Sequence, residues 1–202
     1  MSPADIGRSY DQIAHQWLEP HLQHNGVAAF QRALQFVDAG QPLSALDVGC
    51  GCNSRFADLL HGRGFQVEGV DVSAEMISLA RKKSPEGVFH LADICTWTLP
   101  RQYDFISAWD STWHLPLKEQ APVLEKLCAG LAPGGVLIFT TGGLDAAGEK
   151  HDASMGVPVF YSVLGIPEML RLLHAFGCVC RHLEYDQWPE KHLYVIAQKA
   201  RL

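Results

Sequence analysis

Long hydrophobic runs and basic charge are both scarce in this 202-residue sequence. A membrane-spanning helix needs about 18 or more consecutive apolar residues, and no stretch of the chain comes near that length. Lysine and arginine number 16 against 22 aspartates and glutamates, which gives a net charge of −6. An acidic surface repels the phosphates of nucleic acid. We therefore expect neither a membrane nor a nucleic acid as partner.

Three further patterns are absent: a secretory leader, a disulfide framework and a metal-ligand spacing. Residues 1–11 are polar, with Asp5 and Asp11 where a leader would be apolar, so we expect a cytoplasmic protein. The six cysteines are too few for a disulfide-dense fold and are expected as free thiols. None of the ten histidines has a ligand spacing with a cysteine or carboxylate, and the two Cys-x-Cys pairs lack the wider spacing of zinc sites. No metal is predicted.

What the sequence does contain is typical of one globular domain. Hydrophobic residues make up 48% and charged residues 19%, close to the average of folded proteins. A chain of this length can bury a sizeable core. We expect residues 1–202 to form a single domain, with a helical cap over residues 1–40 and a core over residues 41–202.

Apolar, strand-like runs alternate along the core with segments of helical spacing. Helices are expected at Arg55–His61, Ala74–Lys83 and Glu119–Leu131, the second capped by Ser73. Strands are expected at Ser44–Val48, Gln66–Asp71, Gly87–Leu91, Asp104–Trp109, Gly135–Thr141, Cys178–Tyr185 and His192–Ala197. This alternation predicts an α/β protein with a seven-stranded, mainly parallel sheet covered by helices on both faces.

The two ends of the chain depart from this alternation. The last two expected strands are joined only by Asp186–Lys191, which is too short for a parallel crossover, so the final strand should run antiparallel. Before the first strand, Tyr10–Leu18 and Val27–Asp38 are expected to be helices and to form an N-terminal lid; Gly40 ends the second helix and Pro42 follows it.

One long connection, Gly142–Gly165, links the fifth strand to a helix expected at Pro167–Phe176. Loops of this length in compact domains are often functional lids. We expect this segment to lie near a binding site.

A glycine turn follows the first strand. Gly49 and Gly51 let the backbone turn sharply and approach a ligand closely. Asp71 ends the next strand about 20 residues later, where a carboxylate can accept both hydroxyls of a ribose. The dinucleotide fingerprint has a third glycine where this chain has Ser54, and it does not call for an acid at the position of Asp47. A nucleoside-bearing ligand other than a dinucleotide is indicated.

Several segments resemble, in order and spacing, the motifs of class I S-adenosylmethionine-dependent methyltransferases. Asn53 stands where that family often has a third glycine, and asparagine tolerates the left-handed conformation. The resemblance covers about residues 40–200 and implies a Rossmann-like fold. The matching segments are residues 45–54 (ALDVGCGCNS), 70–76 (VDVSAEM), 91–94 (LADI), 103–109 (YDFISAW), 113–116 (WHLP) and 131–135 (LAPGG).

The resemblance implies a position for the methionine and ribose parts of the cofactor. The methionine part would lie over Gly49 and Gly51, with Asp47 fixing its ammonium group and Trp109 beside it. Asp71 would hold the ribose hydroxyls. S-adenosylhomocysteine would be the product.

The resemblance also implies the adenine contacts. Val72 and Met76 would pack against the two faces of the ring, Asp93 would accept the exocyclic amine, and Ile94 would supply a backbone contact. Tyr10 matches the tyrosine of a leading motif that small-molecule members of the family place close to the cofactor.

The chemistry that this family performs is an in-line displacement of an activated methyl group, which needs no covalent enzyme nucleophile. The protein must hold the acceptor in line and exclude water. A base is needed only where the acceptor carries a proton. His114 is the predicted catalytic residue, with Asp110 and His151 as further candidates.

A small-molecule acceptor is the leading hypothesis, because the ordered motifs are joined only by short, lid-like additions. The aromatic residues near the expected lid would suit a planar or apolar acceptor: Tyr10, Trp17, Trp109, Trp113 and Tyr161. Methylation of nucleic acid or protein is one alternative. A non-catalytic protein that binds S-adenosylmethionine is another, because fold does not guarantee chemistry. Association into a homodimer is left open.

Overall fold

The computed structural model describes residues 1–19, 24–38, 43–53 and 55–201. The expected helix end at Gly40, the following Pro42, the position of Ser54 and the boundary between cap and core lie outside these residues. No helix within the described ranges is long and apolar enough to cross a bilayer.

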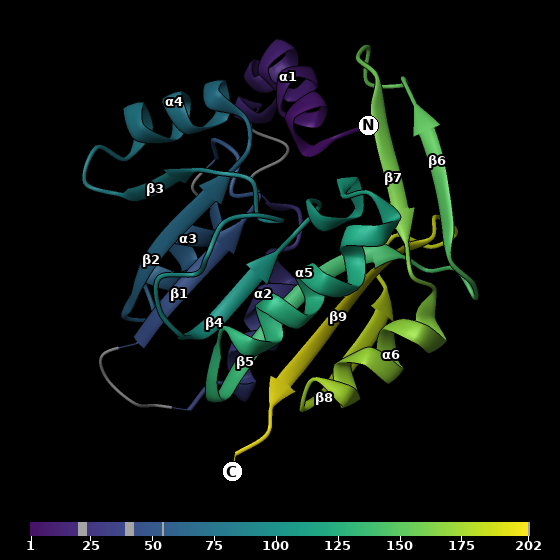
Figure 1. Ribbon diagram of the computed structural model, residues 1–202. Helices are drawn as coiled ribbons and strands as arrows, with labels where there is room; N and C mark the ends of the chain where they lie inside the picture. The colour runs from purple at the N-terminus through teal and green to yellow at the C-terminus, as the bar shows by residue number, and fades with distance from the viewer. Residues whose placement is uncertain (20–23, 39–42, 54, 202) are drawn as a thin grey trace.

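A seven-stranded sheet forms the centre of the molecule, with the strand order β3-β2-β1-β4-β5-β9-β8 (Figure 1). The first five strands are parallel, and β9 is antiparallel to both of its neighbours. The predicted α/β, Rossmann-like sheet with an antiparallel last strand is confirmed. The strands are β1 (Leu43–Val48), β2 (Phe65–Asp71), β3 (Val88–Leu91), β4 (Tyr103–Ala108), β5 (Leu131–Gly142), β8 (Cys178–Tyr185) and β9 (His192–Lys199).

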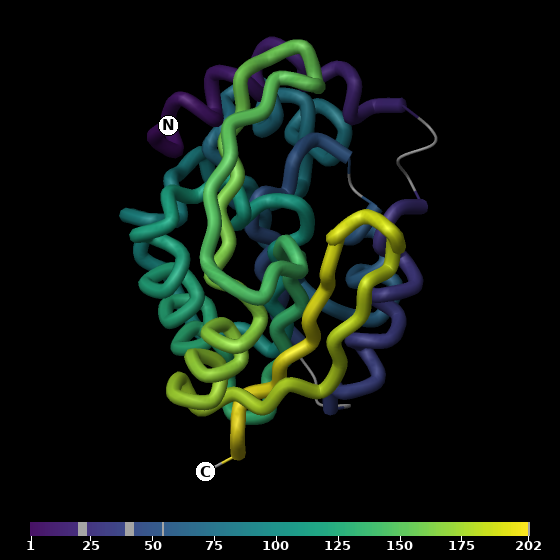
Figure 2. Tube along the Cα trace, turned by 90° about the vertical axis from the view of Figure 1, so that its right-hand side faces the viewer, coloured from purple at the N-terminus to yellow at the C-terminus, as the bar shows by residue number. Residues whose placement is uncertain are grey.

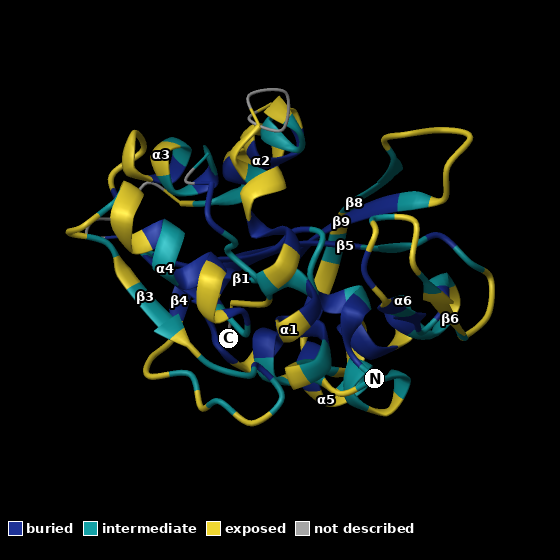
Figure 3. Ribbon diagram, turned by 90° about the horizontal axis from the view of Figure 1, so that it is seen from above, coloured by how far each residue is buried: buried dark blue, intermediate teal, exposed yellow. Residues whose placement is uncertain are grey.

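Helices cover both faces of the sheet, so its central strands carry apolar side chains on both sides. In β5, Val136 and Ile138 point into one hydrophobic core, whereas Leu137 and Phe139 point into the other. Figure 3 shows α2 and α3 on one side of the buried sheet and α5 and α6 on the other. The helices are α1 (Pro3–Ile13), α2 (Val27–Ala33), α3 (Arg55–His61), α4 (Ala74–Lys83), α5 (Leu117–Ala129) and α6 (Ile166–Ala175).

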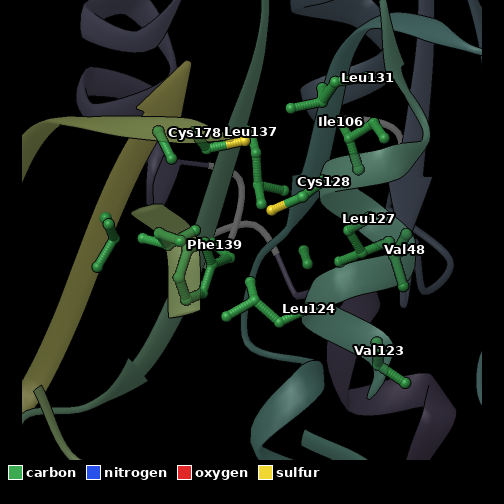
Figure 4. Close-up of a cluster of buried hydrophobic side chains, with 14 of the residues drawn as sticks. Val48, Ile106, Val123, Leu124, Leu127, Cys128, Leu131, Leu137, Phe139 and Cys178 are labelled. Atoms are coloured by element: carbon green, nitrogen blue, oxygen red, sulfur yellow. The ribbon is translucent and has the colours of Figure 1, made fainter. Parts of the chain in front are cut away.

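The core between the sheet and α5 and α6 is densely apolar (Figure 4). Leu124, Leu127 and Cys128 of α5 face Phe139 of β5 and Cys178 of β8. The predicted apolar face of this helix is confirmed, but the helix ends at Ala129 and β5 begins two residues later. The expected range Glu119–Leu131 was therefore placed too late along the chain.

The N-terminal helix differs from its prediction. It begins at Pro3 rather than at Tyr10, because the Ser2 side chain accepts a hydrogen bond from the Asp5 backbone and the Asp5 carboxylate accepts one from the Ser2 backbone. The chain continues as a 3₁₀ helix over Ala14–Leu18. The expected helix at Val27–Asp38 likewise divides into α2 and a 3₁₀ turn at Leu34–Phe36.

The long connection after β5 is not a plain loop. It contains an antiparallel hairpin of β6 (Gly148–Asp152) and β7 (Val159–Val163), whose strands form a separate two-stranded sheet. Val159 and Phe160 of this hairpin pack against Ile6 and Ile13 of α1. The hairpin and the N-terminal helix thus meet over one end of the main sheet, as Figure 2 shows.

Candidate active site

A cavity of about 630 Å³ lies at the carboxyl ends of β1, β2 and β4. This volume is in the usual range for ligand pockets, and this edge is where open α/β sheets bind ligands. All eleven residues predicted for the site line this one cavity: Tyr10, Asp47, Gly49, Gly51, Asp71, Val72, Met76, Asp93, Ile94, Trp109 and His114.

The glycine turn forms the floor of the cavity. Gly49 and Gly51 have φ angles of +70° and +59°, which favour glycine. A Cβ at Gly49 would lie 2.2 Å from Cβ of Ser111, whereas a Cβ at Gly51 would meet only the Met76 sulfur, at 4.0 Å. Gly49 is thus required by close packing, and Gly51 leaves open space above the backbone. Asp110 is the non-glycine residue with positive φ in the described ranges, so the turn does not use the left-handed conformation that Asn53 would tolerate.

Asp71 is held rigidly at the end of β2. Its Oδ2 accepts a hydrogen bond from the Gly51 backbone at 2.9 Å, and its Oδ1 accepts one from the Ser73 backbone at 2.8 Å. Burial raises the pKa of Asp71, although these amide donors oppose the shift. Each carboxylate oxygen keeps a further lone pair, so the group can still accept two hydroxyls from a ligand.

Asp47 is buried under the turn at the end of β1. Its Oδ1 accepts a 2.6 Å hydrogen bond from the hydroxyl of Ser107 on β4. Burial raises the pKa of Asp47 to about 6, against the opposing effects of Ser107 and the nearby guanidinium of Arg55. A buried carboxylate with a raised pKa favours a cationic ligand group, because a positive charge offsets the cost of burying the negative one.

The segment after β3 forms a further wall. Asp93 Oδ1 accepts a hydrogen bond from the backbone of Cys95, which closes a tight turn. The Lys126 ammonium reaches from α5 and donates to the carbonyls of Ile94, Cys95 and Trp97 at 2.6–2.9 Å. The single ammonium group of Lys126 thereby fixes the loop that carries Asp93 and Ile94.

His114 connects three elements around the cavity. Its Nδ1 donates to the carbonyl of Phe160 on β7 at 2.8 Å, so its Nε2 is the acceptor for the Tyr10 hydroxyl at 2.7 Å and the Trp113 indole at 3.2 Å. Burial lowers the pKa of His114 to about 4. The imidazole is neutral at pH 7, and its one lone pair already receives two donors.

Above the cavity, α1 and the β6–β7 hairpin form a roof. Ser9 of α1 donates to the carbonyl of Pro158, and Asp11 accepts hydrogen bonds from the Ser73 hydroxyl and the Glu75 backbone. Tyr161 of β7 and the hairpin's Met155 line the cavity.

His151, the weaker base candidate, lies exposed on β6 and does not line the cavity.

Asp110 follows β4 with a φ of +51°. Its backbone donates to the Thr140 hydroxyl at 2.7 Å, and its Oδ1 accepts from Nε2 of His192 at 2.9 Å. Nδ1 of His192 lies 2.5 Å from an oxygen of Asp186. Although burial opposes the charge, hydrogen bonds from His192 to Asp110 and Asp186 raise its pKa.

Sequence reasoning missed Arg55, Ser111 and His192. Arg55 follows the glycine turn and lines the cavity, and its buried Nε has no hydrogen-bond partner among the described residues. Ser111 donates to the carbonyl of Val48, which locks the loop after β4 onto the glycine turn. The position of Arg55 directly beyond the turn could have indicated its role, but the antiparallel pairing that brings His192 beside Asp110 leaves no local signal.

Comparison with known proteins bears on this geometry. The family described as methyltransferase domain matches residues 21–183. The dTDP-3-amino-3,6-dideoxy-alpha-D-glucopyranose N,N-dimethyltransferase of Streptomyces fradiae is 33% identical over 138 residues, which are 66% of this chain and 52% of that protein. The trans-aconitate 2-methyltransferase of Methylobacterium radiotolerans is 41% identical over 98 residues, which are 48% of this chain and 36% of that protein. The chain thus spans about a third to a half of the length of these two curated relatives.

Solved structures share the fold. The 1,6-didemethyltoxoflavin-N1-methyltransferase of Burkholderia thailandensis, with bound 1,6-didemethyltoxoflavin and S-adenosylhomocysteine, has a TM-score of 0.73 at 19% identity and covers 98% of this chain and 87% of its own. An S-adenosylmethionine-bound amino pentose methyltransferase from Micromonospora echinaspora has a TM-score of 0.66 at 18% identity, over 88% of this chain and 92% of its own. With the family match over residues 21–183 and the shared fold, the chain belongs to the methyltransferase domain family.

Proposed function

We propose that this protein transfers a methyl group from S-adenosylmethionine to a small-molecule acceptor by in-line displacement, releasing S-adenosylhomocysteine. The observation that carries the proposal is that Asp47, the glycine turn, Asp71 and Asp93 all face one cavity at the ligand-binding edge of the sheet. A sugar-nucleotide, an aconitate and a toxoflavin-precursor methyltransferase among the similar proteins support a small acceptor.

The cavity residues fit S-adenosylmethionine. The open space above Gly51 admits the methionine part, and the buried carboxylate of Asp47 suits its ammonium group. Each carboxylate oxygen of Asp71 keeps a lone pair for a ribose hydroxyl. When bound, the cofactor supplies a sulfonium that activates the methyl group.

The adenine would lie between Val72 and Met76, with Asp93 and Ile94 at its edge, and Trp109 and Tyr10 would border the methionine part. All six residues line the cavity. Trp109 is buried and its ring lies about 6 Å from those of Phe30 and Phe56, so it provides a rigid wall.

The chain's own residues would close the reaction off from water. The Tyr10 hydroxyl on α1 is hydrogen-bonded to His114, whose imidazole is hydrogen-bonded in turn to the carbonyl of Phe160 on β7. His114 thereby links the loop after β4 to both parts of the roof. We propose that His114 serves catalysis by fixing Tyr10 and Trp113. To act as a base it would first have to release those two donors.

We further propose that the acceptor is not a nucleic acid and that the protein is cytoplasmic. An acidic net charge of −6 argues against nucleic acid as substrate. Six free cysteines are consistent with a reducing, cytoplasmic location. Protein methylation, a non-catalytic role and a homodimer are alternatives that activity screens and sedimentation would decide.

Isothermal titration with S-adenosylmethionine and S-adenosylhomocysteine tests the proposal. We expect both to bind, and we expect Asp71→Ala to lose about 100-fold or more in affinity, because it removes two hydrogen bonds to a charged group, each worth about 1.5–3 kcal/mol. NAD at the same concentration should not bind. Absence of binding at millimolar concentration would remove the proposal.

A further inference from the structure

Asp110 carries a backbone conformation that non-glycine residues seldom adopt, with a φ of +51°. Residues held in this region cluster at functional sites, where the surrounding structure stabilises them. Here the Thr140 hydroxyl accepts from the Asp110 backbone, and the same hydroxyl lies 3.3 Å from Asp110 Oδ1. β5 therefore holds both the backbone and one carboxylate oxygen of Asp110.

The two oxygens of Asp110 have different surroundings. Oδ1 receives Nε2 of His192 at 2.9 Å and the Thr140 hydroxyl. Oδ2 has a single hydrogen-bond contact within the described ranges, the Asn25 amide at the outer limit of 3.5 Å. Because Asp110 lines the cavity and its side chain is 33% exposed, Oδ2 is the oxygen available to a ligand.

His192 fixes this orientation from behind. Its two ring nitrogens face carboxylate oxygens of Asp110 and Asp186, and carboxylates only accept, so both nitrogens donate. The imidazole ring is in edge contact with Trp113, at a centroid distance of 5.3 Å, and its side chain is only 9% exposed. Asp186, His192 and Asp110 thus form a chain of hydrogen bonds that ends in the cavity.

The groups around Asp110 indicate the kind of ligand. The charge of Asp110 contributes to the pKa values of groups on three neighbouring elements and the loop after β4. Tyr10 of α1, His114 of that loop and Tyr161 of β7 are neutral at pH 7. Arg55 of α3 is a cation. Because His192 already donates to this carboxylate from a ring whose two nitrogens both carry protons, a neutral hydrogen-bond donor suits Oδ2 better than a cation. Trp113 and Tyr161, with ring centroids 5.9 Å apart, supply aromatic walls.

We propose that Asp110 Oδ2 binds the methyl acceptor by accepting a hydrogen bond from an O–H or N–H on the edge of a planar, neutral aromatic or heteroaromatic ring, and that His192 is the positioning residue for this carboxylate. The inference rests on the proposed function, because it assigns the acceptor side of the same cavity. It makes Asp110 a determinant of acceptor specificity.

The test uses the protein saturated with S-adenosylhomocysteine and two probes, catechol, which has hydroxyl donors, and 1,2-dimethoxybenzene, which has none. Affinities are measured by ligand-observed NMR. We expect catechol to bind more tightly, and Asp110→Asn to weaken it about tenfold without changing 1,2-dimethoxybenzene. Asp145→Asn, the same substitution at an exposed position outside the cavity lining, is the matched control and should change neither.

Two further variants keep the result interpretable. His192→Gln retains an amide donor and should preserve part of the catechol affinity, whereas His192→Phe should lose as much as Asp110→Asn. The imidazole NMR signals of His192 should shift when catechol is added to the wild type, but not in Asp110→Asn. Equal affinity of the two probes, or unchanged catechol binding in Asp110→Asn, would overturn the inference. Failure of S-adenosylhomocysteine itself to bind would instead overturn the proposed function.

Discussion

Asp47, Asp71 and Asp110 line one cavity but differ in what offsets their charge. Asp47 is buried and has one hydroxyl donor, Asp71 receives two backbone amides, and Asp110 faces an imidazole that donates from both nitrogens. Only Asp47 lacks both a cation in hydrogen-bond contact and a pair of amides. Its ionisation therefore depends most on what binds beside it.

We expect the affinity for S-adenosylhomocysteine to depend on pH through Asp47. The pKa of Asp47 is raised to about 6, and an ammonium group beside it favours the charged carboxylate. Affinity should therefore be constant above about pH 7 and weaken by up to about tenfold per pH unit below about pH 6. Titration calorimetry from pH 5 to 8 measures this. Asp47→Asn should bind weakly with little change over that range; a wild-type affinity that rises on acidification would contradict the assignment.

We expect His192 to stabilise the folded protein more at low pH than at high pH. Its pKa is raised above 6.5, so the folded state holds its proton more tightly than the unfolded chain does. The stabilisation is fully present below about pH 6.5 and is lost as pH rises through the raised pKa. Urea unfolding of wild type and His192→Gln between pH 5.5 and 9 checks this. The difference in unfolding free energy should shrink as pH rises, and a difference that stays constant would show that the histidine acts by packing alone.

At the scale of elements, the site is built where segments distant in sequence are tied to the strand ends. Asp11 joins α1 to the start of α4, Ser111 joins the loop after β4 to the glycine turn, and Lys126 joins α5 to the loop after β3. Each tie uses a side chain to satisfy backbone or hydroxyl groups of another element. Hydrogen bonds from other elements therefore hold in place the segments that border the cavity.

The tie made by Lys126 can be removed without touching the cavity lining. We expect Lys126→Met, which keeps the apolar stem, to lower the free energy of unfolding by about 2 kcal/mol, because three carbonyls lose a charged donor. S-adenosylhomocysteine affinity should fall several-fold, because the loop carrying Asp93 loosens. Lys118→Met on the same helix, where the side chain is 81% exposed, should change stability by less than about 0.5 kcal/mol. Equal effects of the two substitutions would show that the tie is unimportant.

At the scale of the whole molecule, much of the architecture follows from local pattern. The helices at Arg55–His61 and Ala74–Lys83 agree with their predicted bounds, because a cap, an apolar face and a basic last turn act together in the second and the strand-to-helix turn sets the first. The short link before His192 required antiparallel pairing, which the structure shows. The motifs that carry the family resemblance predicted eleven site residues, and all eleven line one cavity.

Other features depend on contacts that local sequence does not reveal. The β6–β7 hairpin forms in a segment expected to be a loop, and its Val159 and Phe160 pack against residues of α1 that are distant in sequence. The pairing of His114 with Tyr10 spans 104 positions, and that of Asp110 with His192 spans 82. The roles of these histidines follow from three-dimensional neighbours, so the sequence could identify candidates but not their partners.

Binding should stabilise the molecule as a whole if the cavity is a true ligand site. At a concentration 100 times its Kd, S-adenosylhomocysteine should add about 2.7 kcal/mol to the unfolding free energy. For a domain of this size we expect a rise in Tm of about 5–10 °C. Differential scanning calorimetry measures it. Asp71→Ala at the same ligand concentration should show a much smaller rise, and an equal rise in that variant would place the ligand elsewhere.

A crystal structure of the protein with S-adenosylhomocysteine would show directly whether the cavity at the ends of β1, β2 and β4 holds the cofactor. We expect electron density for the ribose within hydrogen-bond distance of both oxygens of Asp71, for the amino-acid part above Gly51 with its ammonium toward Asp47, and for the adenine beside Asp93. Density outside this cavity, or an empty cavity in crystals grown with millimolar ligand, would contradict the proposed site.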